Sequence, residues 1–217
     1  MKRIGMLWIA TLLVVVVCAC GGAALAEKVP HKTEWIPKKN IPLNGIAEMT
    51  YGHRSYARMI ALYNNLDPEK FVPKGTVIKT PALEDLFTDI GLIPKYEKQF
   101  TQIFDVIRRY RILLAEYLPI RRAAYSAYEP GQIDLPEHIS AEFEELATVV
   151  FDTIDEIKEM TAEGGNTPFR MLRQLNKAAG WLGGLGQGYV DGYEYDMDLV
   201  EQRFGNALAN AVAWSRE

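Results

Sequence analysis

The sequence predicts an α+β protein in which a small strand–helix–helix–strand (βααβ) module precedes an all-α helical bundle. Between residues 34 and 82, short segments rich in β-branched residues and bounded by proline or glycine flank two short helical patterns. Beyond residue 83, apolar residues recur at steps of three and four over long stretches. We call residues 34–82 the N-terminal module and residues 83–217 the helical domain.

The N-terminal module is expected to begin with a strand at Trp35–Ile36 and to end with a strand at Thr76–Lys79. Two helices are expected between them, over residues 43–50 and 55–64, because apolar residues follow helical spacing there. In the second helix these residues are Tyr56, Met59, Ile60 and Tyr63. An asparagine can adopt the left-handed conformation that closes a helix, so Asn64–Asn65 is its expected end.

The helical domain is expected to contain long amphipathic helices. The expected segments are residues 81–90, 94–117, 120–128, 136–163, 167–179 and 196–214. Pro119 is predicted to interrupt the second segment, because proline lacks the N–H that the helix needs. The glycine-rich run 180–189 has two interpretations: it allows close helix packing, or it forms a loop that presents Trp181, Tyr189, Tyr193 and Tyr195.

The first 26 residues have the three parts of a secretory signal. Lys2 and Arg3 precede an uncharged, strongly apolar run, which ends in small residues. Residues 27–33 are polar and are interpreted as a tether. The signal indicates export into the cell envelope.

Three fates of this segment are possible. Val17-Cys18-Ala19-Cys20 is similar to a lipobox, in which Cys20 receives a lipid and becomes the new N-terminus. Ala24-Leu25-Ala26 also fits ordinary signal-peptidase cleavage, which would give a soluble periplasmic or secreted protein. The run could also remain as an uncleaved anchor. We favour lipidation at Cys20, with Gly21 in place of an aspartate favouring the periplasmic face of the outer membrane.

Composition excludes several classes of function. Both cysteines lie in the signal, so the exported chain has no disulfide and no thiol chemistry. Removal of Lys2 and Arg3 leaves 22 basic residues against 28 acidic residues, a net charge of −6. A chain of this sign has no evident means of holding nucleic acid, so no nucleic-acid partner is expected.

No catalytic, metal or cofactor site is predicted. His31, His53 and His138 are far apart and lack ligand spacing, and the acidic residues of segment 142–159 fit a solvated helix face. Signatures of zinc peptidases and of nucleophile elbows are absent. A single catalytic glutamate in the helical domain stays open as an alternative.

Two basic clusters stand out in this acidic chain, Arg108–Arg111 and Arg121–Arg122. We expect them to pair with the acidic segment 142–159, which a bundle would place nearby. The alternative is an anionic partner, such as phospholipid headgroups or teichoic polymers.

The N-terminal module resembles a lysin-motif (LysM) domain. The residues that carry the resemblance are Ile46-Ala47, Tyr51-Gly52, Tyr56, Ile60, Asn64-Asn65-Leu66, Asp67-Pro68, Val72, Gly75, Ile78 and Pro81. They occur in the order of that family and at nearly its usual spacing. The resemblance implies a βααβ fold and binding of N-acetylglucosamine-containing glycan, such as peptidoglycan, in a shallow groove between two loops.

The implied groove residues are Asn40, Ile41, Asn65, Leu66, Asp67 and Pro68. The second loop matches the family, whereas the first loop, Asn40-Ile41-Pro42-Leu43, keeps only the leucine of the usual Gly-Asp-Thr-Leu. The sequence thus predicts a non-catalytic envelope binding or adaptor lipoprotein, with peptidoglycan or an envelope protein as partner. The alternatives are a structural subunit of an envelope assembly without glycan binding, and a cell-wall remodelling enzyme or its activator.

Overall fold

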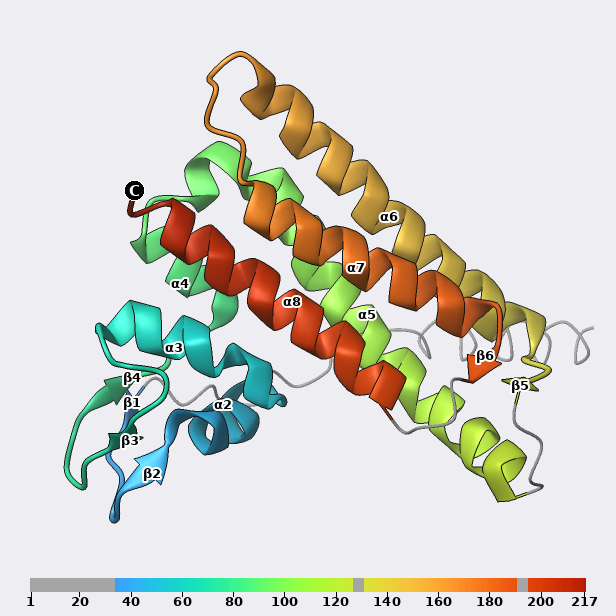
Figure 1. The fold of residues 1–217 in the computed structure, drawn as a ribbon, viewed down its shortest axis with the longest axis horizontal. Coiled ribbons are helices and arrows are strands. Elements are labelled where there is room, and N and C mark those ends of the chain that lie inside the picture. The colour runs from blue at the N-terminus through green and yellow to red at the C-terminus, as the bar shows by residue number, and fades with distance from the viewer. Residues whose placement is uncertain (1–33, 127–130, 191–194) are drawn as a thin grey trace, which may run out of the picture. The chain divides into compact units, whose positions relative to one another are not determined.

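The computed structural model describes residues 34–126, 131–190 and 195–217. The predicted signal, its lipidation site Cys20 and the tether lie outside the described residues. Lys32–Glu217 form one compact unit. The described residues are mostly helical, with short paired strands near the N-terminus and a bundle of long helices (Figure 1). This architecture agrees with the predicted α+β class.

The N-terminal module contains short strands around a helical pair. Its elements are β1 (Glu34–Trp35), β2 (Ile41–Pro42), α2 (Leu43–Tyr51), the 3-10 helix η1 (Arg54–Tyr56), α3 (Ala57–Asn64), β3 (Phe71–Val72) and β4 (Ile78–Lys79). β1 pairs antiparallel with β4, so the strands expected at the two ends of the module meet. β2 pairs antiparallel with β3, which the sequence did not predict.

Two consecutive asparagines connect the end of α3 to β4. Asn65 has φ 55°, the left-handed conformation expected at a helix end. The Asn64 side chain accepts a hydrogen bond from the Lys79 N–H and donates one to the Lys79 carbonyl, each at 2.8 Å. These contacts fix the last strand against the second helix.

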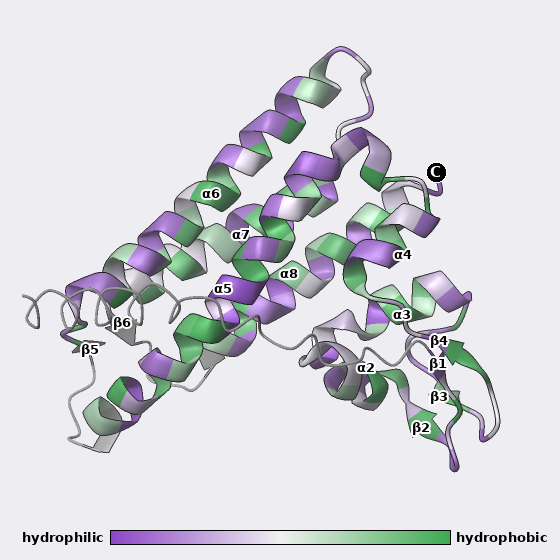
Figure 2. Cartoon of the chain, turned by 180° about the vertical axis from the view of Figure 1, so that it is seen from behind, coloured by the Kyte–Doolittle hydropathy of each residue, from purple (hydrophilic) through white to green (hydrophobic). Residues whose placement is uncertain are grey.

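The helical domain consists mainly of five helices. They are α4 (Leu83–Asp89), α5 (Ile93–Ser126), α6 (Glu137–Ala162), α7 (Phe169–Gly186) and α8 (Tyr195–Trp214), and β5 (Gly131–Gln132) pairs with β6 (Tyr189–Val190). α6 packs against both α5 and α7, and α7 packs against α8. Hydrophobic and hydrophilic residues alternate along α6 and α7, as expected for helices with one buried side (Figure 2).

The predicted interruption at Pro119 is wrong, because α5 runs through it. Pro119 is exposed, and its neighbours Tyr117 and Arg121 are buried on the other side of the helix. Packing of these neighbours therefore holds the helix together despite the missing N–H. The non-helical residue inside α5 is Tyr96, with φ −127° and ψ 27°.

The glycine-rich run continues α7 from its predicted end at Ala179 to Gly186. A Cβ atom added at Gly186 would lie 3.1 Å from the Ser140 carbonyl oxygen and 3.1 Å from the Phe143 Cβ atom. Gly186 therefore permits close packing of α7 on α6, which was one of the two interpretations. Trp181 packs against the core, whereas the side chains of Tyr189, Tyr193 and Tyr195 lie outside the described residues.

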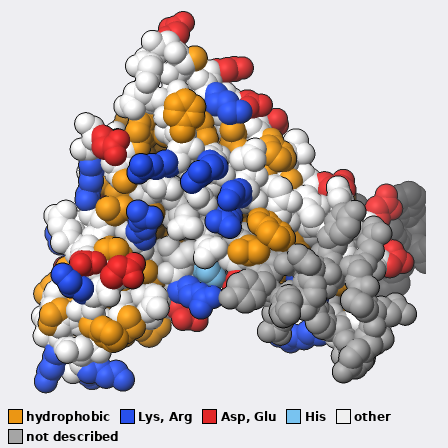
Figure 3. All heavy atoms as spheres, in the orientation of Figure 1, with side chains coloured by type: hydrophobic (Ala, Val, Ile, Leu, Met, Phe, Trp, Pro, Cys, Tyr) orange, Lys and Arg blue, Asp and Glu red, His pale blue; other side chains and the backbone are white. Residues whose placement is uncertain are grey.

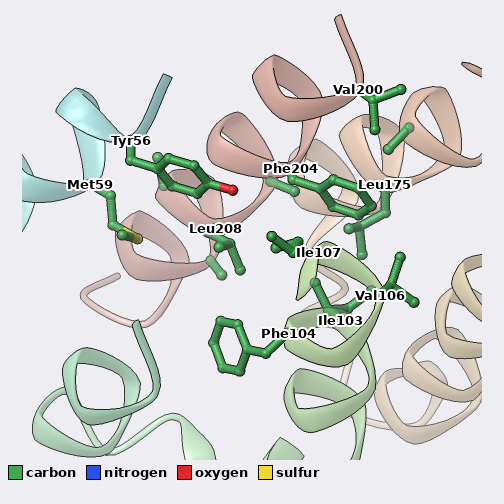
Figure 4. Packing of buried hydrophobic residues seen from close by; sticks show 14 of the residues in the cluster. Tyr56, Met59, Ile103, Phe104, Val106, Ile107, Leu175, Val200, Phe204 and Leu208 are labelled. Atoms are coloured by element: carbon green, nitrogen blue, oxygen red, sulfur yellow. The ribbon is translucent and has the colours of Figure 1, made fainter. Parts of the chain in front are cut away.

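The N-terminal module and the helical domain share one hydrophobic core. Tyr56 and Met59 of the module point toward Leu208 of α8 and Phe104 of α5 (Figure 4). η1 and α3 both contact α8. The module is therefore packed on the helices rather than joined to them only by the chain.

A buried polar network crosses the same contact. The Arg111 Nε atom lies 2.7 Å from one carboxylate oxygen of Glu201, and the Tyr56 hydroxyl donates to the other at 2.8 Å. Arg111 also donates to the Tyr51 carbonyl at 2.7 Å. Glu201 is only 7% exposed. The network thus joins α5, α8 and the N-terminal module.

The predicted pairing between basic α5 and acidic α6 is confirmed in part. Arg109 forms ion pairs with Glu142 at 2.7 Å and with Glu145 at 2.8 Å. Arg111 instead pairs with Glu201 of α8, and Arg108 pairs with Asp105 on its own helix. The pairing of Arg111 with Glu201 could not be inferred from the sequence, because the two residues lie far apart along the chain.

Buried tyrosines predict a loss of stability at alkaline pH. Burial, followed by the charge of Glu201, raises the pKa of both Tyr56 and Tyr110 well above the usual 10. A hydrogen bond to Asp89 raises the pKa of Tyr63 to about 12. Because these groups keep their protons longer in the folded state, stability is fully present below pH 10 and falls as pH rises beyond it.

A buried tyrosine such as Tyr56 that ionises only in the unfolded state should contribute about 1.4 kcal/mol of lost stability per pH unit. Tyr63 is partly exposed, so its contribution should be smaller. The urea midpoint, measured in steps from neutral pH upward, checks this expectation. Tyr63→Phe should leave the midpoint at neutral pH almost unchanged and should reduce its fall above pH 10. A midpoint that stays constant well above pH 10 would contradict the raised pKa values.

Candidate functional site

A hollow of about 600 Å³ lies on the N-terminal module, at the point where its two loops meet. Its walls come from β2, the start of α2, η1, the start of α3 and the segment that leads into β3. The lining residues are Pro42, Asn44, Arg54, Ser55, Ala57, Arg58, Pro68, Glu69, Lys70 and Phe71.

Two local features shape this hollow. Pro42 and Phe71 face each other across the β2–β3 pair, which holds the two loops together. The Asp67 carboxylate accepts a hydrogen bond from the Glu69 N–H at 3.0 Å and lies 3.2 Å from the Lys70 ammonium. These two interactions, the backbone bond first, lower the pKa of Asp67. The turn before β3 is thereby fixed by a side chain that stays ionised.

The lining of the hollow contains three cations, Arg54, Arg58 and Lys70, and one anion, Glu69. Arg54 is paired with Asp198 at 3.4 Å, and Lys70 is paired with Asp67. Arg58 is exposed and has no ion pair with any other residue that the structure describes. Its guanidinium is therefore available to a carboxylate or phosphate of a ligand.

Phe71 adds an apolar surface to this charged rim. Its side chain is 65% exposed, although the neighbouring Val72 is buried in the core. An aromatic ring held at a strand end, with its faces open, can stack against the apolar face of a sugar ring. The arrangement thus suits a ligand that combines a ring with an anionic group.

The predicted groove residues lie in the two loops, but most of them have structural contacts. The Asn40 side chain accepts a hydrogen bond from the Lys74 N–H at 3.0 Å, and Ile41 pairs with Val72. Asn65 ends α3, and its side-chain oxygen lies 3.4 Å from Arg216. Leu66 packs against the core, and Asp67 fixes the turn. Of the six, only Pro68 lines the hollow.

The pairing of β2 with β3 has a consequence for glycan binding. It occupies backbone hydrogen-bonding groups of the first loop, the loop that differs from the LysM pattern. The hollow instead opens toward η1 and the start of α3. Sequence reasoning missed Arg54, Arg58 and Phe71. The two arginines, four residues apart, were a visible signal, whereas the exposure of Phe71 follows from the fold.

Other kinds of site find little support in the described part of the chain. No group of three or more histidine, cysteine, aspartate or glutamate residues there could hold a metal ion. No helix in that part is both long and apolar enough to cross a membrane. Glu201, the one buried glutamate among the described residues, has both carboxylate oxygens occupied by Arg111 and Tyr56. The Glu201 side chain therefore contributes to packing and to charge pairing.

Comparisons of the chain with protein-family models, with curated proteins and with solved structures found no match.

Proposed function

We propose that this chain is a non-catalytic cell-envelope binding protein whose N-terminal module holds peptidoglycan in the hollow beside Phe71. The observation that carries the proposal is that one hollow of about 600 Å³ combines an exposed aromatic ring with Arg58, which has no ion pair within the described part of the chain. Peptidoglycan offers both partners, because its strand of linked sugar rings carries peptide stems that bear carboxylates. A LysM-like identity of the module and lipidation at Cys20 are parts of the same proposal.

The support for a LysM-like module comes from its layout. The antiparallel pair β1–β4 encloses two helices, in the order that the resemblance implies. The first loop departs from the LysM pattern, and its strand β2 pairs with β3. We therefore place the ligand against Arg58, Pro68 and Phe71 rather than along Asn40 and Ile41.

The test is retention of purified residues 27–217 on insoluble peptidoglycan. We expect the parent to be retained and the double variant Arg58→Ala/Phe71→Ala to bind about tenfold more weakly or worse, since aromatic and arginine contacts dominate most interfaces. Both side chains are exposed, so the fold should be unaffected. Alanine at Asn65 would be a poorer probe, because it strains the left-handed helix end.

A matched control is Arg108→Ala/Phe151→Ala, which removes an exposed arginine and an exposed phenylalanine from the helical domain. It should be retained like the parent. Equal retention of both double variants would contradict the assignment of the hollow, and absence of retention of the parent would contradict glycan binding.

The second candidate is a docking module in an envelope assembly without glycan binding. The β2–β3 pair favours it, because that pair occupies the first loop. Failure of the parent to bind peptidoglycan, together with capture of a defined envelope protein that Phe71→Ala abolishes, would support this candidate.

A further inference from the structure

α7 presents a basic face to solvent. Arg170, Arg173 and Lys177 are all exposed and follow one another at steps of three and four residues. They therefore lie on one side of the helix. α7 contains no acidic residue, although the whole chain has a net charge of −4. Positive charge is thus concentrated on one helix of an acidic protein.

These three cations lack partners among the residues that the structure describes. None of them forms an ion pair or a hydrogen bond with another residue in ranges 34–126, 131–190 and 195–217. The neighbouring helices differ, because Lys98 and Arg109 of α5 are paired with acidic residues of α6. Figure 3 shows lysine and arginine side chains gathered over α7 and α8, with acidic side chains toward the margins of this face. An external anion can therefore approach without breaking an ion pair of the described residues.

An apolar side chain accompanies the charges. Phe169, the first residue of α7, is 75% exposed, the highest value among the large hydrophobic residues that the structure describes. A hollow of about 290 Å³ lies beside it, lined by apolar residues that include Phe169 and Trp214 and by polar residues that include Arg170 and Glu217. An exposed aromatic ring beside lysine and arginine can enter the boundary between headgroups and acyl chains while the cations contact the headgroups.

We propose that the exposed face of α7 binds the anionic headgroups of a phospholipid bilayer, with Phe169 entering the interface. Each lysine or arginine close to an anionic bilayer strengthens binding about fivefold. Three of them therefore provide about a hundredfold. The predicted N-terminal signal would bring the protein to a membrane, and the α7 face would then hold the compact unit against it. This surface is separate from the hollow beside Phe71.

The experiment uses residues 27–217, which contain the whole compact unit and lack the apolar segment that would itself enter a bilayer. Binding is measured by sedimentation with vesicles of equal parts phosphatidylglycerol and phosphatidylcholine, and with vesicles of phosphatidylcholine alone. The test variant is Arg170→Glu/Arg173→Glu/Lys177→Glu. The matched control is Lys38→Glu/Lys39→Glu/Lys74→Glu, which makes the same change in net charge at exposed residues of the N-terminal module.

The parent and the control should sediment with the anionic vesicles, and the α7 variant should bind at least about tenfold more weakly. Binding should also fall between about 0.1 M and about 1 M salt, which shortens the Debye length from about 10 Å to about 3 Å. Phe169→Ala should weaken binding while keeping the salt dependence. Circular dichroism checks that each variant is folded.

Three results would overturn the proposal. The first is a parent that does not bind anionic vesicles, and the second is equal binding to vesicles of phosphatidylcholine alone. The third is a folded α7 variant that binds as well as the parent. If the parent does not bind vesicles and the α7 variant is no longer retained on peptidoglycan, the α7 face contacts the wall polymer instead. Arg58→Ala/Phe71→Ala should leave vesicle binding unchanged, so the two proposals fail separately.

Discussion

Gly205→Ala should lower the free energy of unfolding by about 2–3 kcal/mol, because it forces apart two helices that meet at this glycine. A Cβ atom at Gly205 would lie 2.3 Å from the Ser55 Oγ atom and 2.9 Å from the Ser55 carbonyl carbon. Backbone as well as side chain would have to move. Ser55 is also held in place, since its hydroxyl donates to the Glu201 carbonyl at 3.0 Å.

Urea unfolding measures this effect, and Gly180→Ala is the matched control. Nothing lies within 4 Å of a Cβ atom at Gly180, which is inside α7. Alanine there should stabilise the protein by up to about 1 kcal/mol, because it reduces the entropy of the unfolded chain. If the two variants had similar midpoints, the close contact between η1 and α8 would be refuted.

The slope of the unfolding curve carries a second piece of information. If the N-terminal module folds only against α8, Gly205→Ala should shift the single transition as a whole. If the module is stable alone, the variant should show a separate early transition, with a lower apparent dependence on urea. The shared core of Tyr56, Met59 and Leu208 favours the single transition.

Local signals in the sequence predicted the two helices of the N-terminal module and the strands at its two ends, but not β2 and β3. Gly52 and Asn65 end its helices in left-handed conformations, as glycine and asparagine commonly do. Apolar periodicity likewise predicted α6 and α8 almost to their ends. These features depend on residues within a few positions of each other, which is why they can be read without knowledge of the fold.

Features that depend on distant partners could not be predicted. Ile41 pairs with Val72, and Arg111 meets Glu201, only because the folded chain brings these segments together. Pro119 was misjudged because packing of its buried neighbours outweighed a local rule. The hollow has the same origin, since Arg58 and Phe71 belong to different elements and neither marks a site alone.

Glu201→Leu should cost about 3 kcal/mol of unfolding free energy, because it leaves Arg111 and the Tyr56 hydroxyl without their shared partner. Removing one member of a buried ion pair costs more free energy than the intact pair contributes, because an uncompensated charge stays behind. We do not expect a loss of unfolding free energy at the upper end of the range that is usual for broken buried ion pairs. The Arg111 side chain is 37% exposed, so water can solvate part of its charge.

Two further variants make the test specific. Glu156→Gln weakens the more exposed contact with Lys98 and should cost less than about 1 kcal/mol. The double variant Arg111→Met/Glu201→Leu replaces both charges by apolar groups and should recover most of the loss. The comparison also needs the single variants Arg111→Met and Glu201→Leu. If the double variant lost as much free energy of unfolding as these two single variants lose in sum, the two residues would act independently. The network would then not be the element that joins α5, α8 and the N-terminal module.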